Sequence, residues 1–80
     1  MQLPNKLYSY NESIISKFPV VLHELRKSPC GVSELYTKFQ QEVTGTTEFM
    51  EILDCLYALG KVKYDEEAKV LKYVIRNNEH

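Results

Sequence analysis

The stretch "LYALGKVKYD", residues 56–65, changes character at Gly60. Before this glycine, apolar residues recur at the three- and four-residue spacing that is typical of an amphipathic helix. After it, apolar residues alternate with lysines, as on a strand that is buried on one face. Glycine adopts the left-handed conformation that ends many helices at little energetic cost. The stretch therefore predicts a helix that ends at Gly60 and leads directly into a β-hairpin.

The first helix is expected between about residue 10 and Lys27. Ser9 and Glu12 have the spacing of a capping box, in which each side chain bonds a backbone N–H at the start of a helix. Pro19 lies inside this segment, and proline removes one backbone hydrogen bond and clashes with the preceding turn. We therefore expect either a kink at Pro19 or a regular helix that begins near Phe18.

Two further helices and two strands complete the expected elements. The segment "VSELYTKF", from Val32 to Phe39, has the pattern of a short second helix. The third helix is expected from about Glu48 to Leu59, and the strands at about 61–65 and 70–75, joined by "EEAK". The inward residues of the third helix are expected to be Phe49, Ile52, Leu53, Leu56 and Leu59.

Three helices followed by a hairpin are the element order of a winged helix-turn-helix. The sequence thus predicts a mainly α fold with a small two-stranded wing. The whole chain, residues 1–80, is expected to form one domain, with an extended N-terminal arm at 1–8 and a frayed tail at 76–80. A chain of this length buries only about 60–65% of its unfolded surface, so we expect marginal stability without a partner.

Composition places the chain among globular proteins. Apolar residues make up 44% and charged residues 26% of the sequence, and no apolar run approaches the ~18 residues of a membrane span. The first residues lack the apolar core of a signal peptide. We therefore expect a cytoplasmic protein that does not enter a membrane.

No motif in the chain predicts catalysis. The sequence has no glycine-rich phosphate loop, no nucleophile motif and no His–carboxylate spacing for a metal. Cys30 and Cys55 are too few for a disulfide framework, and together with His23 and His80 they do not form a plausible zinc set. We expect no enzyme activity, no cofactor, no metal and two reduced cysteines.

Charge argues against direct reading of DNA. The formal net charge is −1, and the expected outer face of the third helix carries Glu48, Glu51 and Asp54 but no lysine or arginine. In a helix-turn-helix this face would approach phosphates, which have the same sign of charge. Lys61, Lys63 and Lys72 of the hairpin remain as a modest candidate stripe for phosphates. They support an alternative function, a small DNA-binding regulator or architectural subunit.

The same helix offers a candidate surface for protein partners. Met50 and Tyr57 lie at the edge of its apolar stripe, and methionine and aromatic residues are enriched in interfaces. The candidate interaction residues are Glu48, Met50, Glu51, Asp54 and Tyr57. Two alternatives stay open: Met50 and Tyr57 pack on the N-terminal arm or the wing, or the chain forms a homodimer through Val20 and Tyr10.

Three segments together resemble a known family. These are "LPNK" at 3–6, "VSELYTKF" at 32–39 and "FMEILDCLYALGKVKYD" at 49–65. They are similar to the small middle component, of the sixth type, of bacterial ABC-three component systems. The resemblance implies a non-catalytic winged-helix adaptor that contacts a large SMC-like ABC ATPase or a third, variable component. It also implies a role in defence against phages or plasmids, and it matches Asp54 to a family position.

Overall fold

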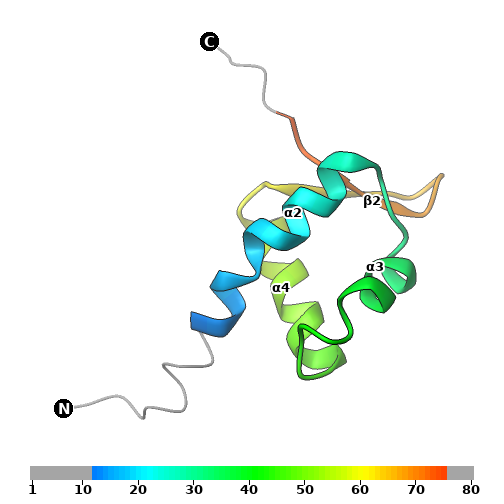
Figure 1. Ribbon diagram of the computed structural model, residues 1–80. Coiled ribbons are helices and arrows are strands. Elements are labelled where there is room, and N and C mark those ends of the chain that lie inside the picture. The colour runs from blue at the N-terminus through cyan, green and yellow to red at the C-terminus, as the bar shows by residue number, and fades with distance from the viewer. Residues whose placement is uncertain (1–11, 76–80) are drawn as a thin grey trace.

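The computed structural model describes residues 12–75, which fold into helices and one β-hairpin (Figure 1). After residue 17 the elements are α2 (Phe18–Lys27), α3 (Val32–Phe39), α4 (Thr46–Ala58), β1 (Val62–Asp65) and β2 (Val70–Tyr73). The two strands pair antiparallel, β2 packs against α2, and β1 follows α4 closely. The expected mainly helical architecture with one hairpin is confirmed. The predicted arm at 1–8, the capping residue Ser9, Tyr10 and the tail at 76–80 lie outside the described residues.

The first helix is divided at Lys17. Residues 12–16 are helical, Lys17 forms a turn, and α2 begins at Phe18 with proline in its first turn. The first residues of a helix have no intrahelical partner for their N–H groups, so Pro19 loses nothing there. The second of the two expectations for Pro19, a regular helix that starts near Phe18, is therefore confirmed.

The connection between α2 and α3 pairs with the hairpin. The Cys30 N–H donates to the Leu71 carbonyl oxygen over 3.1 Å, and the Leu71 N–H donates to the Cys30 carbonyl oxygen over 2.7 Å. Both residues belong to the core, where burial raises the pKa of the Cys30 thiol. This two-bond bridge holds β2 beside the carboxyl end of α2.

The core lies among the three helices and one face of the hairpin. Its buried apolar residues after residue 17 are Val21, Leu25, Cys30, Leu35, Phe39, Phe49, Ile52, Leu53, Leu56, Val62 and Leu71. The Tyr36 and Phe49 rings meet edge to face with their centroids 5.2 Å apart, a favourable geometry for aromatic pairs. The buried residues include Phe49, Ile52, Leu53 and Leu56, so four of the five inward positions expected for α4 are confirmed.

Leu59 is the exception, and its inward placement is wrong. Its side chain is 57% exposed, because α4 ends at Ala58 and the chain turns away from the core at Gly60, where φ is 75°. The second strand is also shorter than expected. It ends at Tyr73, and Ile75 is 75% exposed.

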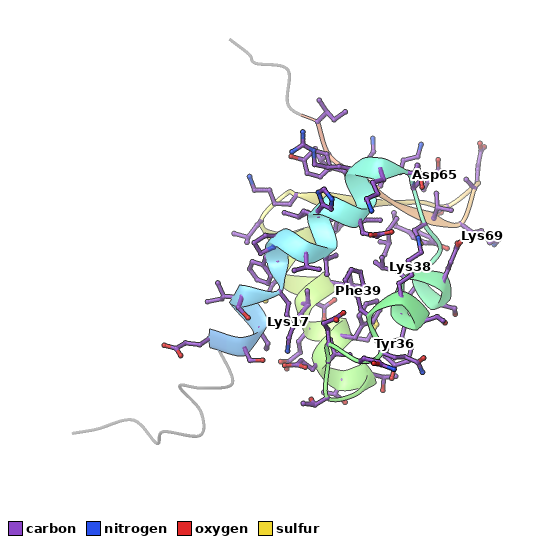
Figure 2. All side chains as sticks on the ribbon, in the orientation of Figure 1. Lys17, Tyr36, Lys38, Phe39, Asp65 and Lys69 are labelled. Atoms are coloured by element: carbon purple, nitrogen blue, oxygen red, sulfur yellow. The ribbon has the colours of Figure 1, made fainter. Side chains whose placement is uncertain are left out.

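The hairpin register places Val62 opposite Tyr73 and Lys63 opposite Lys72. Its turn is stabilised by Asp65, whose Oδ1 accepts hydrogen bonds of 3.0 Å from the N–H groups of Glu67 and Ala68. The Ala68 N–H, followed by the Lys72 ammonium and then the Glu67 N–H, lowers the pKa of the Asp65 carboxyl. Lys69 closes the turn with a φ of 61° (labelled in Figure 2).

One carboxylate is buried where α4 begins. Glu48 is 2% exposed, and its Oε1 accepts a 2.8 Å hydrogen bond from the Thr44 N–H. Its Oε2 accepts from the Ser13 hydroxyl at 3.1 Å, and the Lys17 ammonium lies 3.4 Å from the carboxylate. Lys17 also donates to the Ser13 hydroxyl over 2.8 Å. The carboxylate thus connects the N-terminal helical residues with the loop before α4 (Figure 2, Lys17 labelled).

The placement of Glu48 on the outer face of the third helix is therefore wrong. The helix begins two residues earlier than expected, at Thr46, and the first turn of α4 directs Glu48 towards Ser13 and Lys17. The Thr44 N–H, followed by the Ser13 hydroxyl and Lys17, lowers the pKa of Glu48 against the opposing effect of burial. Its charged form is stabilised inside the fold.

We predict that Gly60→Ala lowers the free energy of unfolding by about 1–2 kcal/mol, because alanine is strained at positive φ. Gly31→Ala is the matched control. Gly31 has φ −65° and ψ 156°, and an added Cβ would lie 3.7 Å from the nearest atom, an ordinary contact. Urea denaturation of both variants measures the difference. Equal stabilities would contradict the role given to Gly60.

We predict that Glu48→Ala lowers the free energy of unfolding by about 2–4 kcal/mol at neutral pH, since it removes the acceptor of the Thr44 N–H and the carboxylate partner of Lys17. Glu48→Gln retains an acceptor oxygen, and its loss should be smaller. Circular dichroism during thermal or urea denaturation provides the measurement.

The pH dependence of stability tests the same carboxylate. A lowered folded pKa means that the charged group stabilises the fold above its ordinary value of 4.5, and that this contribution is lost as pH falls through the lower, folded value. Between about pH 5 and pH 3 the native protein should therefore lose more stability than Glu48→Gln. Parallel losses in the two proteins would show that Glu48 does not titrate in this way.

Candidate protein-interaction surface

The exposed side of α4 carries two large apolar side chains. Met50 is 45% exposed and Tyr57 is 67% exposed, and Asp54 is exposed between them. Residues four and three apart follow one another along a helix face, so these three side chains form one stripe. Glu51 is exposed beside this stripe. We refer to Met50, Glu51, Asp54 and Tyr57 as the α4 outer face.

The α4 outer face combines apolar and acidic side chains. No lysine or arginine lies between Thr46 and Ala58, so the charged side chains that this helix contributes are all acidic. Four of the five predicted interaction residues are brought together here, and the fifth, Glu48, is buried away from them. The alternative in which Met50 and Tyr57 pack on the wing does not hold, because both side chains are exposed. The alternative in which they pack on the N-terminal arm involves residues outside the described range.

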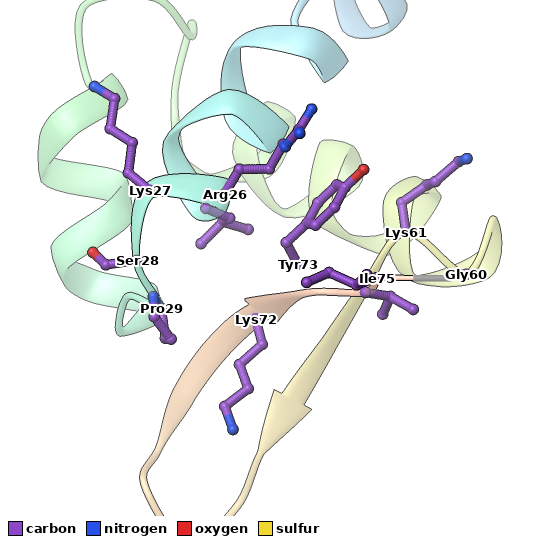
Figure 3. A pocket seen from close by; sticks show the side chains of 11 residues that line it. Arg26, Lys27, Ser28, Pro29, Gly60, Lys61, Lys72, Tyr73 and Ile75 are labelled. Atoms are coloured by element: carbon purple, nitrogen blue, oxygen red, sulfur yellow. The ribbon is translucent and has the colours of Figure 1, made fainter. Parts of the chain in front are cut away.

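The predicted phosphate stripe of Lys61, Lys63 and Lys72 forms only in part. Lys61 and Lys63 are exposed, but the Lys72 ammonium lies 3.0 Å from Asp65 Oδ2. Figure 3 shows that the side chains of Lys61 and Lys72 point in opposite directions from the hairpin. Lys63 and Lys72 are register partners on one face of the hairpin, whereas Lys61, at the turn after Gly60, points away from Lys72. Phosphate contacts by these lysines stay a prediction.

A groove lies where the carboxyl end of α2 meets the hairpin (Figure 3). It encloses about 660 Å³, and residues 25–29, 60–61 and 72–75 line it. The Arg26 guanidinium carbon lies over the Tyr73 ring, 5.3 Å from its centroid. The sequence analysis missed this groove. Arg26 and Tyr73 are far apart in the chain, and no local sequence pattern links them. Their contact depends on the Cys30–Leu71 bridge, which holds β2 beside α2.

Several charged side chains near this groove form ion pairs with one another. Glu24 lies between two ammonium groups, at 3.5 Å from Lys27 and 3.1 Å from Lys38. The hydrogen bond from Lys38 lowers the pKa of Glu24 and raises that of Lys38 (labelled in Figure 2). These contacts connect α2 with α3 across the surface, and they engage Lys27, one of the cations that line the groove.

Two classes of site are not seen in the described residues. Between residues 12 and 75 no three His, Cys, Asp or Glu side chains lie close enough to hold a metal ion. Within the same range no helix has the length and apolar character needed to cross a membrane. The cytoplasmic location and the lack of enzyme activity stay predictions.

Comparison with known proteins identifies the family. No curated protein and no solved structure is significantly similar to the chain. A family model, that of ABC-three component system Middle Component 7, matches residues 3–71. The resemblance to a middle component is thus confirmed, whereas the sixth type is not, because the matching model is that of the seventh. The match spans most of the sequence, and the chain belongs to the Middle Component 7 family of ABC-three component systems.

Proposed function

We propose that the chain is a winged helix-turn-helix domain that serves as a non-catalytic accessory subunit of an ABC-three component system. It acts in the cytoplasm through protein–protein contacts, with a large SMC-like ABC ATPase or the variable third component as its partner. The biological role that we infer is bacterial defence against phages or plasmids. The observation that carries the proposal is the α4 outer face, which exposes Met50 and Tyr57 on either side of Asp54.

The chemistry of this face suits a partner with a basic and apolar surface. Tyrosine offers a large rigid contact area with a polar end, and methionine adapts to irregular surfaces. Buried aromatic anchors carry much of the binding free energy at interfaces. Asp54 would set orientation and favour cationic partners, since like-charged surfaces are rejected. The order of elements, three helices and a hairpin, supports the winged-helix assignment.

The test is co-expression of the tagged protein with the other components encoded by its system, followed by affinity purification. We expect the ATPase or the third component to co-purify at a fixed ratio. Tyr57→Ala should reduce recovery about tenfold or more, the effect of losing an interface anchor. Asp54→Lys should also reduce it, because the reversed charge would face a basic partner.

Glu67→Lys is the matched control for Asp54→Lys, since it makes the same charge change at an exposed position in the hairpin turn. It should leave recovery unchanged. If the α4 variants co-purify as well as the native protein, α4 is not the interface. If no component co-purifies with the native protein, the accessory role itself fails.

The second candidate function is a DNA-binding regulator or an architectural subunit. Its support is that Lys61 and Lys63 are exposed and have no acidic partner within residues 12–75. The acidic α4 outer face opposes it. We expect no measurable binding of duplex DNA by the isolated protein at about 0.15 M salt. Tight binding that weakens steeply with added salt, and further in Lys61→Gln and Lys63→Gln, would favour the second candidate instead.

A further inference from the structure

We infer that the groove between the carboxyl end of α2 and the hairpin binds an extended acidic segment of a partner protein. The inference rests on the proposed function, because it names the chemistry of a second contact that the accessory subunit makes. It concerns residues other than the α4 outer face. The groove is the one defined by residues 25–29, 60–61 and 72–75 (Figure 3).

Charge is the first argument. The lining contains Arg26, Lys27, Lys61 and Lys72 and no aspartate or glutamate. Two of these cations already have partners, since Lys27 pairs with Glu24 and Lys72 with Asp65. Within residues 12–75, Arg26 and Lys61 have no acidic partner. These two cations are therefore the ones available to an anionic ligand.

The geometry of Arg26 prepares it for a carboxylate. Its guanidinium stacks on the Tyr73 ring at 5.3 Å, a contact that uses the face of the cation. The N–H donors lie at the edge of the guanidinium plane, where they match the two oxygens of a carboxylate. In Figure 3 the side chains of Arg26 and Lys61 extend to the same side of the hairpin, with Tyr73 between them. An acidic residue over Tyr73 would meet both cations.

The backbone of β2 indicates that the ligand is extended. The Val74 N–H donates to the Lys61 carbonyl oxygen over 2.9 Å, so the Tyr73 N–H and carbonyl point away from β1, as strand alternation requires. On that side β2 pairs with Cys30 only at Leu71, and the preceding Ser28 and Pro29 line the groove. Within residues 12–75 the Tyr73 backbone groups have no hydrogen-bond partner. A peptide strand can add to such an edge.

Apolar surface distinguishes a peptide from a nucleic acid. Ile75, which is 75% exposed, and Tyr73 line the same groove as the two cations. An acidic peptide can place an aliphatic side chain against Ile75, whereas a phosphate backbone has no group for it. Nucleic-acid binding also depends on many phosphate contacts, and the net charge of −1 and the paired Lys72 leave few cations for them.

The test uses a fluorescein-labelled octapeptide of alternating glutamate and leucine, titrated with the full-length protein and followed by fluorescence anisotropy. We expect saturable binding at about 0.15 M salt. Arg26→Gln and Lys61→Gln should each weaken it about tenfold or more, the loss typical of one charge-assisted hydrogen bond. In nitrogen-15 NMR spectra the Tyr73 amide resonance should shift on binding.

Lys63→Gln is the matched control. It removes the same charge from an exposed hairpin lysine that does not line the groove, so binding should be retained. Equal weakening by Lys63→Gln would show non-specific attraction and overturn the inference. Absence of peptide binding would also overturn it, as would tighter binding of labelled duplex DNA with the same dependence on Arg26 and Lys61.

The inference and the proposed function can fail separately. If components co-purify but Arg26→Gln, Lys61→Gln and the peptide show no effect, the accessory role stands and the groove is not a contact. If the peptide binds in the groove but no component of the system co-purifies, the proposed function fails and the groove remains a site for acidic segments.

Discussion

The two hydrogen bonds between Cys30 and Leu71 fix the position of the hairpin relative to the helices, and the groove depends on them. They hold the α2–α3 connection against β2, which keeps the hairpin next to α2 although the hairpin follows α4 in the chain. They also place Tyr73 beneath Arg26 and form one wall of the groove. A short backbone bridge of this kind turns a two-stranded hairpin, which is marginal alone, into part of the core.

The buried carboxylate of Glu48 likewise connects separate segments, at the amino end of α4. Glu48 binds the Thr44 N–H, the Ser13 hydroxyl and Lys17 simultaneously, so each polar group in the site has a partner. Removal of one member of such a cluster costs more than the intact pair contributes, because a charge is left buried alone. The same burial removes one acid from the surface of α4, which makes that surface more apolar than the sequence suggests.

The described residues thus present two chemically different surfaces. The α4 outer face joins acids to Met50 and Tyr57, whereas the groove joins Arg26 and Lys61 to Tyr73 and Ile75. A net charge of −1 conceals this separation, because the acids and bases largely cancel in the sum. We propose that the α4 outer face contacts a basic partner surface and that the groove binds an acidic segment.

Local sequence alone determined the order of the elements, the end of the third helix at Gly60, the start of α2 near Phe18 and most of the core positions of α4. These features depend on spacing within a few residues, on the φ of glycine and on the missing N–H of proline. The placement of Glu48, the separation of Lys61 from Lys72 and the contact of Arg26 with Tyr73 depend on residues distant in the chain. A helical wheel places every polar residue, Glu48 included, on the exposed side. The alternation of side chains along a strand does not account for the turn after Gly60, where Lys61 lies. Only the tertiary structure therefore decided which charges are buried, which are paired and which meet across the groove.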